Sequence, residues 1–100
     1  MTTILLSDTF RTWPAGLKDH RAKARIAAQI RAAGFDNVGN VKPVGSGVCE
    51  MRIPYGPGYR VYYVRRGEVT SLLLCGGDKA SQTRDIQRAK RMAANLDGTV

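Results

Sequence analysis

The clearest pattern of apolar and polar positions lies in residues 47–82. Within it, residues 48–53 alternate between apolar and polar side chains, as in a strand with one buried face. The other face of that strand presents two charged side chains, Glu50 and Arg52. Charged side chains inside so apolar a strand need a reason. Glu50 and Arg52, with Arg60 on the next stretch, are therefore the first candidates for function.

Two further strands are predicted in the same region. Residues 59–64 are rich in β-branched and aromatic side chains, which favour strands. Residues 69–75 are nearly all apolar, as in a central strand covered on both faces. The turn-rich segment 54–58 and the pair Arg66-Gly67 supply tight connections. The pattern therefore predicts consecutive antiparallel strands.

Helical spacing appears on the N-terminal side of these strands. A first helix, capped by Ser7 or Asp8, is expected to be short or bent because Pro14 interrupts its apolar face. A second helix is expected to follow Asp19 as its N-cap and to end at Gly34, a residue suited to the left-handed position after a helix. The buried stripe of this second helix is predicted to be Ala22, Ile26, Ile30 and Ala33.

The remaining elements are shorter or lie at the end of the chain. Residues 3–6 predict an edge strand, and another strand is expected near residues 41–42. A final helix is expected to run from a cap at Ser81 to about Leu96, leaving residues 97–100 as a frayed tail. This order predicts a single α+β domain over the whole chain, with two helices packed on one face of a curled antiparallel sheet.

Composition adds a strong positive charge to this picture. The chain has 16 Lys and Arg against 8 Asp and Glu, a net charge of +8, and a pI of about 10.1. Most of the basic residues are arginine, which suits phosphate contacts and stacking on bases. A polyanionic partner is therefore expected.

The sequence offers little for metal or redox chemistry. Cys49 and Cys75 lie among apolar neighbours on predicted strands, which favours free thiols that pack as small hydrophobes. Two cysteines and the single His20 do not form a metal-binding pattern, so neither a metal nor a cofactor is expected. The first residues do not resemble a secretory signal, and the apolar runs are too short to span a membrane. We expect a cytoplasmic, reduced protein.

An ordered set of short motifs covers residues 10–94. The motifs are Phe10-x-x-Trp13, Leu17-x-Asp19, Ala24-Arg25-Ile26, Gly47-Val48-x-Glu50-x-Arg52-Ile53, Gly56-Pro57-Gly58-Tyr59-Arg60-Val61-Tyr62 and Gly76-Gly77-x-Lys79-x-x-Gln82-x-x-Asp85-Ile86-x-x-Ala89. Together they resemble the HigB-like "addiction module killer" branch of the RelE/ParE toxin superfamily. The resemblance implies a RelE-like curled sheet with two N-terminal helices on one face and a C-terminal helix. Pro14 departs from the leucine expected after the tryptophan, which affects only the first helix.

The resemblance also implies a function. Such a chain is the toxin of a type II toxin–antitoxin module, neutralised by a helix-turn-helix antitoxin, and a toxin–antitoxin heterotetramer is one arrangement to expect. RelE-like members cleave mRNA on the ribosome, whereas ParE-like members inhibit DNA gyrase without nuclease residues. We take the ribosome-dependent mRNA endoribonuclease as the leading hypothesis. The alternatives are a non-enzymatic gyrase inhibitor and a degenerate toxin that only binds its antitoxin.

RNA cleavage by the 2′-hydroxyl requires a proton acceptor, stabilisation of the phosphorane and protonation of the leaving oxygen. Antiparallel pairing is expected to bring Glu50 and Arg52 of one strand close to Arg60 and Tyr62 of the next. Lys79 precedes a helix N-terminus, which favours anions. A supporting ion pair between Glu50 and Arg52 is the structural alternative. The candidate catalytic residues are Arg60, Arg52, Lys79, Glu50 and Tyr62.

Two basic stripes at helical spacing are the candidates for binding RNA or a partner. One joins Lys18 to Arg25 and the other joins Arg84 to Arg91, each beside an apolar stripe. Such stripes are also typical of a solvated helix face. The candidate RNA-binding residues are Lys18, Arg21, Arg25, Gln82, Arg84 and Arg88.

Overall fold

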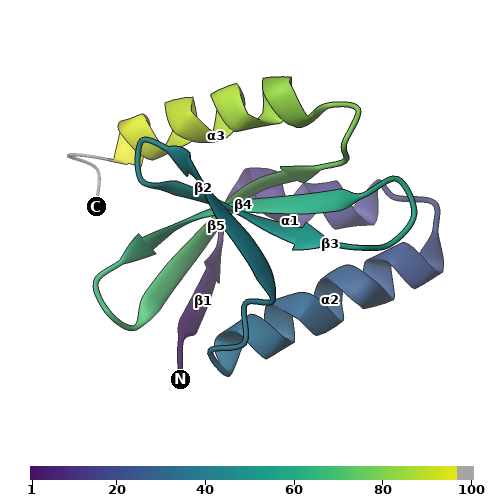
Figure 1. Ribbon diagram of the computed structural model, residues 1–100, viewed down its shortest axis with the longest axis horizontal. Helices are drawn as coiled ribbons and strands as arrows, with labels where there is room; N and C mark the ends of the chain where they lie inside the picture. Colours follow the sequence, from purple (N-terminus) through teal and green to yellow (C-terminus); the bar gives the residue numbers. More distant parts are fainter. Residues whose placement is uncertain (97–100) are drawn as a thin grey trace.

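The pattern of residues 47–82 folds into the antiparallel strands that it predicts. The strands are β3 (Val48–Ile53), β4 (Tyr59–Arg66) and β5 (Thr70–Gly77). Pairing of β3 with β4 and of β4 with β5 is antiparallel throughout. They form the centre of a five-stranded sheet in the computed structural model, which describes residues 1–96 (Figure 1). The tail expected at residues 97–100 lies outside the described residues.

The sheet is mixed, so the prediction of a wholly antiparallel sheet is wrong. Its strand order is β1-β5-β4-β3-β2, and β1 (Thr3–Leu6) pairs in parallel with β5. Between these two strands the chain passes through two helices and three other strands, so no hairpin dictates the direction of β1. Its predicted position at an edge is confirmed.

The opposite edge strand is longer than expected. It is β2 (Asn40–Gly45), and its pairing with β3 shifts between Pro43 and Gly45. Gly45 has a φ of 99°, a conformation that costs little only without a side chain. Pro43 lies in this outer strand, where a missing amide is tolerated.

The first two helices begin where their capping residues predict. Ser7 caps α1 (Asp8–Ala15) by accepting a hydrogen bond from the amide of Phe10, and Pro14 lies in its last turn. Asp19 caps α2 (His20–Gly34) in the same way.

The prediction that Gly34 takes the left-handed position at the end of α2 is wrong. The helix ends at Gly34, but the residue in the left-handed region is Asp36, with a φ of 68°, and not Gly34. Asp36 accepts a hydrogen bond from Thr2 at 2.6 Å and pairs with the amino group of Met1 at 2.9 Å. Aspartate tolerates this conformation better than most residues, and these contacts from the N-terminus hold it there.

Apolar side chains form a core on each face of the sheet. One core joins α1 and α2 to the sheet, and it includes Phe10, Ile26, Met51, Val61 and Leu73. The other core packs α3 (Gln82–Leu96) against the opposite face, and it includes Val48, Val64, Leu74, Cys75 and Ala89. Figure 1 shows α3 and α2 on opposite sides of the strands. Both faces of β5 are therefore covered, as its continuous apolar run predicts. Among the described residues, no helix is long and apolar enough to span a membrane.

Candidate functional site

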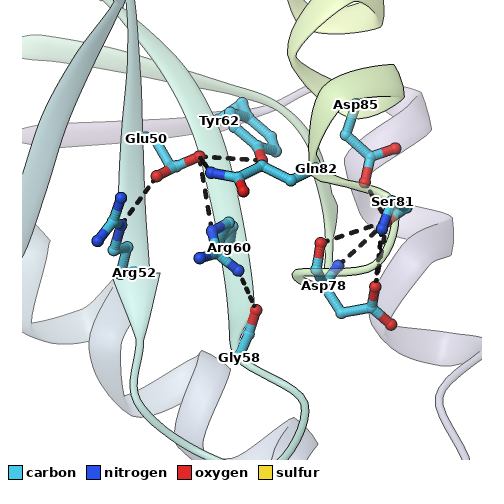
Figure 2. A network of polar contacts seen from close by, with 9 residues as sticks. All are labelled: Glu50, Arg52, Gly58, Arg60, Tyr62, Asp78, Ser81, Gln82 and Asp85. Atoms are coloured by element: carbon cyan, nitrogen blue, oxygen red, sulfur yellow. Dashed lines mark hydrogen bonds and ion pairs between the residues drawn. The ribbon is translucent and has the colours of Figure 1, made fainter.

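A buried carboxylate on β3 is the centre of the candidate site. Glu50 has no exposed surface, although Cys49 and Arg52 of the same strand are partly exposed. The register places it opposite Tyr62 of β4 and places Arg52 opposite Arg60. The prediction that strand pairing brings these residues together is confirmed (Figure 2).

Three hydrogen bonds converge on Glu50. Arg52 donates its Nε hydrogen to Oε1 at 2.9 Å. The Tyr62 hydroxyl donates to Oε2 at 3.2 Å, and Gln82 donates its amide Nε2 to the same oxygen at 2.9 Å. Gln82 is the first residue of α3, so this bond joins the helix to the sheet. Glu50 thus ties together strands β3 and β4 and the start of α3.

Arg60 is the second charged group of the site, and its guanidinium is incompletely satisfied. Its Nε lies 3.6 Å from Oε2 of Glu50, too far for a hydrogen bond, and that buried atom has no other partner among the described residues. Its Nη1 donates to the carbonyl of Gly58 at 2.8 Å. Only 8% of the residue is exposed. A buried donor without an acceptor is costly, so negative charge brought close to this guanidinium would be stabilising.

The protonation of the site is set by competing effects on Glu50. Burial alone would raise the pKa of this carboxyl. The hydrogen bonds from Gln82, Arg52 and Tyr62, together with the charge of Arg60, outweigh burial and hold the pKa below its ordinary value. Glu50 is therefore an anion at neutral pH. Burial and the negative charge of Glu50 raise the pKa of Tyr62. Tyr62 is fully buried, so it supports Glu50 and is not accessible to a ligand from solvent.

The start of α3 is occupied by the protein's own acids. The amide of Ser81 donates to the carboxylate of Asp78, and the Ser81 hydroxyl contacts the buried carboxylate of Asp85. A Cβ atom at Gly77 would lie 1.8 Å from Oδ2 of Asp85, so only glycine leaves room for that carboxylate. These carboxylates take the place where the sequence predicts an external anion beside Lys79.

Lys79 nevertheless lies close to Arg60. Its amide faces the carbonyl of Pro57 at 3.3 Å, which holds the loop before α3 against the loop between β3 and β4. A Cβ atom at Gly58 would lie 3.3 Å from Nη1 of Arg60 and 3.7 Å from Cβ of Lys79. The side chain of Lys79 is exposed, so it extends the positive charge of Arg60 and Arg52 to the surface.

The basic stripe around α2 adjoins the same loop. The Arg25 guanidinium lies 5.1 Å from the centre of the Tyr55 ring, and the Tyr55 hydroxyl lies 3.4 Å from Asp19. Arg21 and Arg25 are exposed on the helix, but Lys18 precedes the N-cap and is not part of it, which corrects the predicted helical stripe.

The stripe on α3 is separate from the Glu50 network. Arg84 and Arg88 are exposed, and Arg84 lies 3.9 Å from Asp85. Gln82 belongs to a different group, because its side chain is bound to Glu50. Of the candidate RNA-binding residues, it is the one that the structure brings into the network.

The cysteines are free thiols in the structure, as expected. Cys75 is buried, and burial with the nearby charge of Asp85 raises its pKa to about 11. Cys49 is half-buried. Within residues 1–96 no three His, Cys, Asp or Glu side chains are grouped in a way that could hold a metal ion.

Two parts of the site escape prediction from sequence. An acid in the first turn of a helix, such as Asp85, is expected to be exposed. In the structure Asp85 is only 6% exposed and fills the space over Gly77. The hydrogen bond from Gln82 to Glu50 joins residues 32 positions apart, so no local sequence pattern predicts it. The one available signal is the spacing of Gly77, Ser81 and Asp85, which places a small residue before a capping serine and an acid one turn later.

The chain is similar to a known protein over most of its length. No family model matches the chain. An uncharacterized protein of Haemophilus influenzae is 48% identical over 88 residues, which cover 88% of this chain and 89% of that protein.

Proposed function

The chain belongs to the same family as this uncharacterized Haemophilus influenzae protein, and we propose that it is the toxin of a type II toxin–antitoxin module. Its activity in this proposal is ribosome-dependent cleavage of mRNA in the cytoplasm, on a RelE-like domain. The observation that carries the proposal is the Arg60 guanidinium, buried beside Glu50 with its Nε lacking an acceptor among the described residues. A phosphate oxygen is an acceptor of suitable charge.

The cations are arranged for a reaction that creates negative charge. Cleavage begins when the 2′-hydroxyl of a nucleotide loses its proton and attacks the adjacent phosphorus. The bond from phosphorus to the 5′-oxygen then breaks, that oxygen takes up a proton, and a 2′,3′-cyclic phosphate remains. Arg60 and Arg52 stabilise the charged phosphorane, and Lys79 draws the phosphate to the site. None of these cations needs to change protonation state to act.

Glu50 acts in this proposal as a positioning residue. It accepts bonds from Arg52, Tyr62 and Gln82, and its pKa is lowered, so it is a poor proton acceptor. The Glu50 carboxylate accepts a hydrogen bond from Nε of Arg52 and places its charge 3.6 Å from Nε of Arg60. Because Nη1 of Arg60 donates to Gly58, Nη2 of Arg60 and the terminal nitrogens of Arg52 are left for phosphate. The 2′-hydroxyl proton passes to water, and the ribosome supplies the orientation of the mRNA that accounts for much of the rate.

A reporter mRNA translated in a cell extract tests this function. Purified protein should cut the message at discrete sites that are mapped by primer extension, and naked mRNA should remain largely intact. The Arg60→Ala variant should lower the cleavage rate by about 10² or more, because it removes a group that stabilises the transition state. Its circular dichroism spectrum and melting temperature must show that it still folds. An intact message in the presence of folded wild-type protein would rule out the proposed reaction.

One observation favours the non-enzymatic alternative, inhibition of DNA gyrase. Glu50 and Tyr62 are both fully buried, and the Glu50 carboxylate accepts three hydrogen bonds from the protein itself, so neither the acid nor the phenol of the site is free to transfer a proton to or from a substrate. A site built this way can bind a phosphate without cutting the chain. A supercoiling assay with purified gyrase distinguishes the two, since inhibition of supercoiling with an intact reporter message would replace the nuclease by this alternative. Inactivity in both assays, with retained antitoxin binding, would indicate a degenerate toxin.

The proposal includes a helix-turn-helix antitoxin that silences the toxin, in a heterotetramer or a smaller complex. A partner that competes with RNA for a protein of charge +8 needs acidic groups or must cover the basic surface. The exposed arginines of α2 and α3 are available to it. Charge reversal of Arg84 and Arg88 should weaken the complex in titration calorimetry while leaving the melting temperature nearly unchanged. Charge reversal of Arg21 and Arg25 is measured in the same way. A larger loss of affinity in that variant would mean that the antitoxin contacts α2 and not α3.

A further inference from the structure

The two edges of the sheet are protected very differently. Strand β2 carries Lys42, Pro43 and an irregularity in register, features that discourage pairing with another chain. Strand β1, with the sequence TILL, has none of them. Leu5 is 50% exposed and Leu6 is 37% exposed. Of the two edges, only β1 is open to another strand.

The backbone of β1 can form a further ladder. The amides of Thr3 and Ser7 donate to carbonyls of Val69 and Leu73, on the side of β5. Because alternate residues of a strand direct their amides to opposite sides, those of Ile4 and Leu6 point to the outer edge. At the start of this edge the amide of Thr2 already donates to the carbonyl of Gly34 at the end of α2. Beyond it, from Ile4 to Leu6, no strand among the described residues lies on the outer side.

An apolar groove adjoins this edge. It has a volume of about 220 Å³ and is lined by Leu6 of β1 together with Phe10, Pro14, Ile26 and Ile30 of the first two helices. A strand added to β1 would continue the pleat of the sheet. Every second side chain of that strand would then lie on the face where Leu6 meets the groove.

The groove is lined by positive charges, which favour an acidic binding partner. Arg11 and Lys23 also line it, and neither belongs to an ion pair among the described residues. We propose that the outer edge of β1 and this groove bind an extended segment of a partner protein, apolar at alternate positions and acidic between them, by strand addition. Binding there is independent of the reaction at Glu50.

A second copy of the chain fits this surface poorly. Each copy carries a net charge of +8, and pairing of two β1 strands would bring Arg11 and Lys23 of both copies together. Like charges brought together in this way disfavour association. An acidic segment would instead be attracted to Arg11 and Lys23.

The test uses the full-length, isotope-labelled protein and a short synthetic peptide in which valine alternates with glutamate. Titration followed by NMR should shift the amide signals of Ile4, Leu5 and Leu6 and slow the hydrogen exchange of Ile4 and Leu6, whose amides point to the outer edge. The Arg11→Glu, Lys23→Glu double variant should weaken binding by about tenfold or more, about 1.4 kcal/mol. The matched control is Lys42→Glu, an exposed position on the opposite edge strand β2, and it should bind as the wild type does.

Two sets of control peptides make the outcome decisive. With lysine in place of glutamate, binding should be lost. Peptides N-methylated at every second residue, made in both registers, should differ, because only one register keeps the amides that pair with β1. Equal binding by the two methylated peptides, or by the lysine peptide, would overturn the proposal. So would shifts confined to β2, or a homodimer in light scattering that involves β1.

Discussion

Glu50 shows how one buried residue can organise a site. Its carboxylate is fully buried and receives hydrogen bonds from Arg52, Tyr62 and Gln82. A buried charge is tolerated only when such partners offset the loss of water. The site therefore depends on Glu50 even though this residue need not touch a substrate.

Replacing Glu50 with glutamine should destabilise the protein by about 3 kcal/mol, because Arg52 and the buried Arg60 lose the charge that balances them. Urea denaturation of the purified variant measures this change. Glu68→Gln is the matched control, since that side chain is exposed, and it should cost under about 0.5 kcal/mol. A variant as stable as the wild type would mean that the network contributes little to folding.

The lowered pKa of Glu50 predicts how stability depends on pH. The folded state binds the Glu50 proton less readily than the unfolded state, so this residue stabilises the fold above its ordinary pKa of 4.5. The contribution is lost as the pH falls below 4.5 and through the folded-state value. The free energies of unfolding of wild type and Glu50→Gln should therefore converge in acid. Parallel curves from neutral pH to acid would contradict this assignment.

At the scale of elements, close contacts between a helix and a strand fix the position of α1. A Cβ atom at Gly76 in β5 would lie 2.4 Å from ring atoms of Trp13. The indole also packs near Phe10 and Tyr59, with ring centres 5.7 and 6.1 Å away. Gly76 therefore lets the α1 helix approach the sheet.

Gly76→Ala should destabilise the fold by about 1–3 kcal/mol, because the added methyl group would overlap the indole of Trp13. Thermal unfolding measures the loss. Gly16→Ala serves as the control, since its new Cβ would meet only ordinary contacts at 3.6 Å or more, and it should leave stability nearly unchanged. Equal melting temperatures for the two variants would show that α1 can shift without cost.

Much of this arrangement follows from local sequence, and the part that does not is long-range. Alternation in residues 48–53 predicts the polar face that carries Glu50, and Ser7 and Asp19 predict the helix starts. The parallel direction of β1 depends on packing between distant segments, which local sequence does not encode. The same holds for the left-handed Asp36, which is held by residues 34 and 35 positions earlier in the chain.

At the scale of the molecule, basic groups extend from the site along one surface. Arg25 packs on Tyr55 in the loop between β3 and β4, and the same loop contacts the backbone of Lys79 through Pro57. This loop also holds Arg60, which donates to the carbonyl of Gly58, whereas Arg88 lies on α3 and does not contact the loop in these interactions. Under the proposed function, RNA bound near Arg60 would therefore meet further cations in the direction of α2.

Charge reversal of Arg21 and Arg25 should therefore weaken binding of single-stranded RNA more than reversal of Arg88 and Arg91. The dependence of affinity on salt should also become shallower, by roughly 0.7 in the logarithmic slope for each phosphate that the variant no longer neutralises. Fluorescence anisotropy over a range of salt concentrations measures both effects. A larger loss of affinity in the α3 variant would place the RNA path along that helix instead.

The fit between Gly77 and Asp85 has a consequence for how this family diversifies. The carboxylate occupies the space that any side chain at position 77 would need, so neither position can change freely while the other stays the same. Among homologous genes, a larger residue at position 77 should appear together with a smaller one at position 85, as a correlated pair of substitutions. A lineage that acquires only the first change passes through a less stable intermediate, and selection will tend to remove it.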